Sequence, residues 1–239
     1  DFLWNSGIGT STSPNSMTYK GTAPFSEPEA RNVKYLFDTF DQIQYYVDVH
    51  SHGQLILYNW GDDNNQSAIP AQNFLNSAFN GQRGIPNDAV YREFIPALDE
   101  NTATSLAQRM KTALQAVRGK NYTVQQSVGL YPTSATSDDY AFSRHLVNSL
   151  KNKVYAYTVE FGEEFVPPFA EMSHILNDIG AALTEFCWAV NSEVCLRDTP
   201  LDVGTVPSTG AFWNSPDIWI RNVNDGGTVH QNTIRGRDN

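Results

Sequence analysis

The chain has 239 residues, a length that fits one large domain or one domain with an appendage. Hydrophobic residues make up 40% of it, enough for a sizeable core, yet no stretch approaches eighteen consecutive apolar residues, so a membrane partner is not expected. The 16 basic and 26 acidic residues give a net charge of −10, which argues against a nucleic-acid partner.

The hydrophobic pattern predicts strands that alternate with helices. A helix is expected to begin at the capping box Ser26–Glu29, which places proline in the first turn. The further elements are expected as strands at 44–50 and 54–58, a helix from 99 to 117, a strand at 154–161 and an amphipathic helix at 172–190. This alternation predicts an α/β fold with a largely internal sheet.

The composition changes after residue 195. Residues 196–210 are rich in Pro, Thr and Gly and are typical of a linker. Residues 211–239 contain a β-prone run with two Trp, but about thirty residues cannot form a core of their own. We therefore expect one domain over 1–195, a linker over 196–210 and the start of a β-rich accessory domain over 211–239.

Several small features favour a secreted protein. Asn65-Gln66-Ser67 and Asn121-Tyr122-Thr123 are glycosylation sequons, although such triplets also arise by chance. Cys187 and Cys195 are the only cysteines, and they could close a small disulfide loop in an oxidising compartment. Two unrelated thiols are an equally good explanation of this pair.

Two polar residues at the ends of expected strands are candidates for chemistry. His50 ends the run Tyr-Val-Asp-Val-His, and Glu160 ends Tyr-Ala-Tyr-Thr-Val-Glu. Functional groups gather at the carboxyl ends of strands in α/β sheets, and a buried Glu is rare without a partner or a role. The alternative is that each is a strand-end polar residue whose hydrogen bonds are satisfied by nearby backbone.

Short blocks along residues 1–195 identify a family when they are taken in order. They are Tyr19–Gly21, Phe25–Glu29, His50–Tyr58, Leu130–Pro132, Ser137–Tyr140, Tyr157–Glu160 and Phe165–Pro168. In this order they resemble segments of the zinc carboxypeptidases of the pancreatic A/B type and their bacterial relatives. The resemblance implies a mixed central β-sheet flanked by helices, and it implies that this chain is the C-terminal portion of such a domain.

The resemblance also implies roles for individual residues. His50 would be one of three protein ligands of a catalytic Zn²⁺. Glu160 would be the general base and acid that takes a proton from the zinc-bound water and passes it to the leaving amine. Tyr131 would be a mobile phenol that closes over the substrate, while Ser51 and Phe165 would line subsites beside the scissile bond. The alternatives are a loop aromatic for Tyr131 and plain core for Phe165.

The chain departs from the family pattern at other positions. The family's first two zinc ligands lie in a His-x-x-Glu motif, and no such motif occurs in this sequence. The arginines that grip the substrate's terminal carboxylate also lie upstream of the matching blocks. We therefore expect an upstream segment of the same precursor, carrying these ligands and arginines, as a partner. His52 stands where the family usually has Tyr, which leaves that subsite contact in doubt.

The expected activity is that of an exopeptidase that removes the last residue from peptide or protein C-termini. In the resemblance, Asp138 occupies the floor of the specificity pocket, where B-type enzymes carry Asp and prefer Lys or Arg. The alternative is that Asp138 faces solvent or that only Asp139 points inward. A non-catalytic binding or structural protein on the same fold is the second functional hypothesis, and an amidase or deacylase is the third.

Overall fold

The computed structural model describes residues 2–191, 193–196 and 218–221. The chain divides into two compact units, residues 1–185 and 186–239. The first unit contains the central sheet, three of the four long helices and most of the fourth. Within the described residues, no helix is both long and apolar enough to cross a membrane.

A four-stranded sheet forms the centre of the first unit. Its strands are β1 (Tyr45–His50), β2 (Leu55–Tyr58), β5 (Thr123–Gln126) and β6 (Tyr155–Glu160), in the order β1-β6-β2-β5. β6 runs parallel to β1 and antiparallel to β2, and β2 runs parallel to β5. The sheet is therefore mixed, as the resemblance implied.

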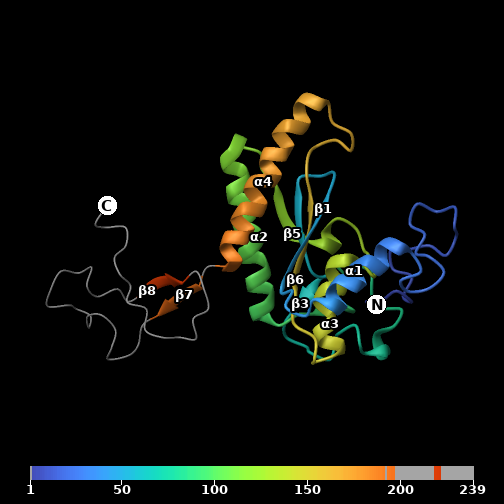
Figure 1. The fold of residues 1–239 in the computed structure, drawn as a ribbon. Helices are drawn as coiled ribbons and strands as arrows, with labels where there is room; N and C mark the ends of the chain where they lie inside the picture. The colour runs from blue at the N-terminus through green and yellow to red at the C-terminus, as the bar shows by residue number, and fades with distance from the viewer. Residues whose placement is uncertain (1, 192, 197–217, 222–239) are drawn as a thin grey trace, which may run out of the picture. The chain divides into compact units, whose positions relative to one another are not determined.

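Helices cover both faces of this sheet (Figure 1). The helices are α1 (Pro28–Thr39), α2 (Ala97–Arg118), α3 (Ser137–Val147) and α4 (Phe169–Asn191). The hydroxyl of Tyr157 on β6 donates a hydrogen bond to the carbonyl of Ala103, which ties one face to α2. Ala156 points to the opposite face and packs in one buried cluster with Phe37 of α1 and Ala141 of α3. The predicted α/β class is confirmed.

The start of α1 differs from the predicted capping box. Glu27 is the N-cap residue and its side chain makes no capping hydrogen bond, while the hydroxyl of Ser26 donates to the carboxylate of Glu27 instead. The helix still begins at Pro28, whose fixed φ and missing N–H suit the first turn. The predicted start was right, but the predicted reciprocal cap was wrong.

A long loop between β2 and α2 carries only short elements. They are β3 (Asn65–Gln66), the 3₁₀ turn Ser77–Phe79 and β4 (Glu93–Phe94), with β3 and β4 paired in parallel. The loop buries Asp62 and Glu93 completely. Glu93 accepts hydrogen bonds from the Phe74 amide at 2.8 Å and from the Tyr91 hydroxyl at 2.5 Å, whereas neither oxygen of Asp62 has a donor among the described residues.

The second unit shows one antiparallel pair of strands, β7 (Glu193–Leu196) and β8 (Ile218–Arg221). β8 lies in the run that the sequence analysis gave as β-prone. Most of residues 196–239, and the side chain of Cys195, lie outside the described part of the chain. The linker over 196–210, the accessory domain over 211–239 and the Cys187–Cys195 pairing therefore stay predictions.

Candidate active site

His50 and Glu160 end the two neighbouring strands β1 and β6. The strands are parallel, and the register sets His50 directly opposite Glu160 and Asp48 opposite Thr158. Since alternate residues of a strand share one face, these four side chains point to the same side of the sheet. The His50 Nδ1 lies 3.7 Å from the Glu160 Oε1. The sheet itself thus brings together the two strand-end candidates of the sequence.

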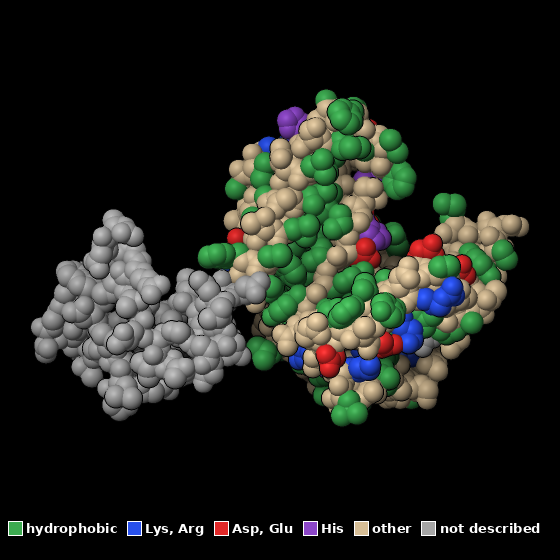
Figure 2. All heavy atoms as spheres, in the orientation of Figure 1, with side chains coloured by type: hydrophobic (Ala, Val, Ile, Leu, Met, Phe, Trp, Pro, Cys, Tyr) green, Lys and Arg blue, Asp and Glu red, His purple; other side chains and the backbone are tan. Residues whose placement is uncertain are grey.

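A cavity of about 290 Å³ opens above this face of the sheet. Tyr131 and Asp138 line it together with His50 and Glu160. Its remaining lining residues are Asp48, Leu57, Ser127, Leu130, Thr133, Thr136, Ser137 and Thr158. Figure 2 shows histidine and acidic side chains beside a hollow on the face that it draws.

The imidazole of His50 lies between two carboxylates. Its Nε2 is 3.3 Å from Oδ1 of Asp48, and its Nδ1 faces Glu160. The hydrogen bond to Asp48 is the main reason that the pKa of His50 is raised, with the charge of Glu160 acting in the same direction. The same bond, assisted by a hydrogen bond from the Ser137 hydroxyl, lowers the pKa of Asp48.

Glu160 has the environment of a proton acceptor. It is only 8% exposed, and burial raises the pKa of its carboxyl. Its Oε2 is buried and has no hydrogen-bond partner among the described residues. A desolvated carboxylate with a vacant oxygen at a cavity wall can accept and return a proton, which is what a general base and acid must do.

Asp138 lies at the start of α3 and is 1% exposed. Its oxygens accept hydrogen bonds from the Ser127 hydroxyl at 3.2 Å and the Asp139 amide at 3.0 Å, and both donors are neutral. The adjacent Asp139 is also buried, but its oxygens are occupied by the Asn59 side chain and the Gly61 amide. Of the two carboxylates, Asp138 is the one that lines the cavity.

The other predicted substrate contacts differ in position. Tyr131 follows the 3₁₀ turn Ser127–Gly129, is largely exposed and borders the cavity. Ser51 is exposed and Phe165 is 71% exposed, and neither borders the cavity. The Phe165 ring lies edge-on to His52, with 6.3 Å between ring centroids. The core alternative for Phe165 is therefore wrong.

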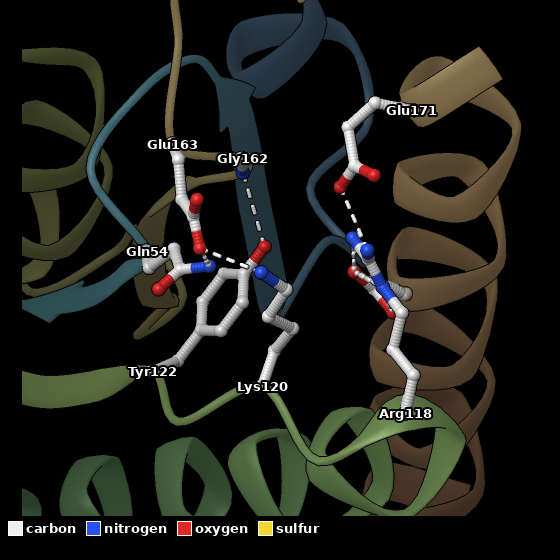
Figure 3. A network of polar contacts seen from close by, with 8 residues as sticks. Gln54, Arg118, Lys120, Tyr122, Gly162, Glu163 and Glu171 are labelled. Atoms are coloured by element: carbon white, nitrogen blue, oxygen red, sulfur yellow. Dashed lines mark hydrogen bonds and ion pairs between the residues drawn. The ribbon is translucent and has the colours of Figure 1, made fainter.

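Polar contacts hold the loop that follows Glu160 (Figure 3). Glu163 accepts hydrogen bonds from Lys120 at 2.6 Å and from Gln54 at 3.1 Å. The Gly162 amide donates to the hydroxyl of Tyr122, a side chain that is fully buried. The segments after β6, after α2 and before β2 are thereby joined next to the candidate base.

Comparisons with known proteins assign the chain to a family. Residues 1–179 match the family described as zinc carboxypeptidase. The chain belongs to the zinc carboxypeptidase family.

Curated relatives of this chain include two proteins named carboxypeptidase B. That of Helicoverpa zea is 48% identical over 68 residues, which are 28% of this chain and 16% of the relative. That of Astacus astacus is 30% identical over 161 residues, which are 66% of this chain and 41% of the relative. The chain thus spans less than half the length of either relative.

A solved structure shares the fold of this chain. It is that of bovine thrombin-activatable fibrinolysis inhibitor in complex with tick carboxypeptidase inhibitor, with a TM-score of 0.54. The match covers 79% of this chain and 54% of the other at 19% identity, so it supports the fold and nothing finer.

The described residues include a candidate ligand for a zinc ion but do not complete a zinc site. His50 offers one imidazole nitrogen on the cavity side, and the vacant Oε2 of Glu160 borders the same space. Among the described residues, no group of three His, Cys, Asp or Glu side chains is arranged to hold a metal ion. A catalytic zinc needs about three protein ligands, so further ligands have to be added to His50.

Sequence reasoning missed two parts of this site. Asp48 was overlooked, although its position two residues before His50 on a strand already places both side chains on one face. Ser127 and Ser137 gave no such signal, because they reach the site only through the packing of α3 and the 3₁₀ turn against the sheet.

Proposed function

We propose that the protein is a zinc-dependent exopeptidase that hydrolyses the C-terminal residue of peptides and proteins, with a preference for Lys and Arg. One observation carries the proposal. A single cavity is lined by His50, Glu160, Tyr131 and Asp138, which come from two strands, a loop and a helix. These residues would be a metal ligand, a base, a closing phenol and a specificity carboxylate.

The chemical step divides between the metal and the protein. His50, together with ligands from an upstream segment, would hold the zinc, which would supply a Lewis acid for the scissile carbonyl. Glu160 takes a proton from the attacking water and delivers it to the leaving amine, which its raised pKa and vacant oxygen support. Arginines of the same upstream segment bind the substrate's terminal carboxylate.

Tyr131, Ser51 and Phe165 bind the substrate on either side of the reacting bond. Tyr131 is exposed at the mouth of the cavity and closes over the bound peptide. Ser51 and Phe165 lie outside the cavity, so they contact residues that precede the scissile bond rather than the residue that is removed.

Asp138 sets the preference for basic residues. Its buried carboxylate receives hydrogen bonds only from the neutral hydroxyl of Ser127 and the amide of Asp139. An apolar side chain in the cavity would leave this charge without a counterion, whereas Lys or Arg would neutralise it.

The test compares two peptides that differ only in a C-terminal Arg or Phe, with the complete, zinc-loaded protein. We expect wild type to favour the Arg peptide in kcat/KM by at least about 10²-fold. Binding of the Phe peptide would leave the buried carboxylate of Asp138 without a counterion, which costs several kcal/mol. Asp138→Ile should reverse this preference, and the isosteric Asp138→Asn should reduce it while the fold is kept.

Three outcomes would contradict the proposal. Equal or better cleavage of the Phe peptide by wild type would remove the basic preference. An unchanged Arg-to-Phe ratio in Asp138→Ile would remove Asp138 from specificity. Cleavage of neither peptide by the zinc-loaded protein would favour the non-catalytic alternative.

A further inference from the structure

Asp48 holds a position that the proposed function does not use. It precedes His50 by two residues on β1, so both side chains point into the same cavity. Its Oδ1 lies 3.3 Å from the Nε2 of His50, on the side of the ring away from Glu160. Each nitrogen of this imidazole therefore has a different environment.

The carboxylate of Asp48 is itself held in place. Its second oxygen accepts a hydrogen bond from the hydroxyl of Ser137, the first residue of α3. Ser137 directly precedes Asp138, so the start of α3 carries both the hydrogen-bond donor to Asp48 and the candidate specificity carboxylate. The Asp48 side chain is 29% exposed, against 48% for His50, so the more buried group orients the more exposed one.

This geometry has a consequence for the imidazole protons. A neutral imidazole carries one N–H, and the tautomer is fixed by whichever nitrogen has an acceptor. Asp48 is the nearer acceptor, at 3.3 Å from Nε2, while Glu160 lies 3.7 Å from Nδ1. A proton is therefore favoured on Nε2, which leaves the lone pair of Nδ1 on the side of Glu160. Carboxylates that hold a metal-binding imidazole in this way commonly account for 10- to 100-fold in metal affinity.

We propose that Asp48 is a positioning residue that fixes the tautomer and ring direction of His50, so that Nδ1 is presented to a metal ion. The value of this arrangement for catalysis rests on the proposed function. The contact between Asp48 and His50 does not, because it is present in the metal-free chain.

The first test is made on the complete protein with ¹⁵N-labelled histidine, after removal of metal by a chelator, at a pH where the ring is neutral. Wild type should show His50 protonated at Nε2, with an N–H proton that exchanges slowly enough to be observed. Asp48→Ala should lose that proton signal to exchange with water, and its two tautomers should average. An unchanged His50 spectrum in Asp48→Ala would overturn the proposal.

The second test titrates zinc against a competing chelator. Asp48→Ala should bind zinc about 10- to 100-fold more weakly than wild type, and the size-conserving Asp48→Asn should fall between them. Asp38→Ala is the control, because Asp38 has a similar exposure of 34%, makes ion pairs with Lys34 and Arg144 and does not border the cavity. It should bind zinc like wild type.

The two tests separate the possible failures. Zinc affinity that is equal in wild type, Asp48→Asn and Asp48→Ala would also overturn the role of Asp48. If wild type binds no zinc at all but shows the protected Nε2–H that Asp48→Ala loses, then the proposed function fails while the positioning of His50 by Asp48 stands. If Asp48→Ala does not fold, Asp48→Asn carries both measurements.

Discussion

At the scale of single residues, two buried carboxylates at one cavity differ in their hydrogen bonds. Glu160 has one oxygen without a partner among the described residues, and burial raises the pKa of its carboxyl. Asp138 accepts one hydrogen bond on each oxygen, from the Ser127 hydroxyl and from the Asp139 amide. The proposed function uses this difference, because it assigns the proton transfer to Glu160 and the contact with a basic side chain to Asp138.

Replacing Glu160 by Gln should keep the shape of the site and remove the proton acceptor. We expect kcat to fall by at least about 10²-fold, the usual contribution of general acid–base catalysis, with zinc content unchanged. Glu164→Gln, an exposed change four residues later, should retain wild-type turnover. Near-normal turnover of Glu160→Gln in a steady-state assay would exclude this residue from the mechanism.

The sequence predicted part of the residue-scale picture. His50 and Glu160 could be identified because strand ends and family blocks coincide there. The sequon at Asn65 shows the limit, since its side-chain amide donates to the Asn59 carbonyl and its oxygen accepts from the Trp60 amide. The nitrogen also donates to Glu100, so a glycan, which replaces one of its two hydrogens, would displace one of these donated bonds. Asn121, in the other sequon, is exposed.

At the scale of elements, α2 and α4 lie side by side and are joined by ion pairs of unequal burial (Figure 1). Arg118 binds the fully buried Asp178 through two nitrogens, and this bond raises the pKa of Arg118. Arg109 and Glu185 make a second pair that is largely exposed. The buried pair is expected to matter more, because water screens it less.

Asp178→Asn should lower the free energy of unfolding by about 2–4 kcal/mol, because it leaves Arg118 without its buried counterion. Glu185→Gln removes the exposed counterpart and should cost less than about 1 kcal/mol. Urea denaturation of the complete protein measures both. Equal effects of the two changes would show that burial does not distinguish the pairs.

The helices and strands were not equally predictable. The period of apolar residues marks α2 and α4, since each has one apolar side. The sequence analysis missed α3 because its buried positions include Asp138, Asp139 and Arg144, which no hydrophobic pattern reveals. It also missed β5, a four-residue strand of which only Val124 is apolar.

At the scale of the whole molecule, the strand order could not be worked out from periodicity. β1 and β6 are adjacent although more than a hundred residues separate them in sequence, and local patterns carry no information on such pairing. The mixed sheet came with the family resemblance instead. Neither the periodicity of apolar residues nor the family resemblance predicted the buried Asp62 and Glu93 of the loop between β2 and α2.

The stability of the molecule should fall as pH rises from about 4.5 to about 7. Burial raises the pKa of Glu93 to about 7, and burial next to Glu93 raises that of Asp62 as well. In this window the folded state keeps a proton that the unfolded chain releases, so the free energy of unfolding falls as pH rises. Unfolding free energies measured at pH 5 and pH 8 test this slope.

Glu93→Gln should reduce the difference in unfolding free energy between pH 5 and pH 8 by at least about 1 kcal/mol, since one pKa unit corresponds to about 1.4 kcal/mol. Its amide would also supply a donor for the unpartnered oxygens of Asp62. Glu29→Gln, on the exposed surface of α1, should leave the slope as it is in wild type. A wild-type slope in Glu93→Gln would show that the Asp62–Glu93 pair does not bind the proton.

The candidate site has a part on paired strands and a part on a loop, and we expect the two to differ in mobility. His50 and Glu160 sit on paired positions of one hydrogen-bonded ladder, so their spacing changes only when the ladder opens. Tyr131 sits on a loop and can swing without disturbing that ladder. Hydrogen exchange should therefore find amide protons of β1 and β6 protected up to global unfolding, while those around Tyr131 exchange through small, frequent openings. In the proposed function, movement of Tyr131 would admit and release the substrate, while the spacing of His50 and Glu160 would stay fixed.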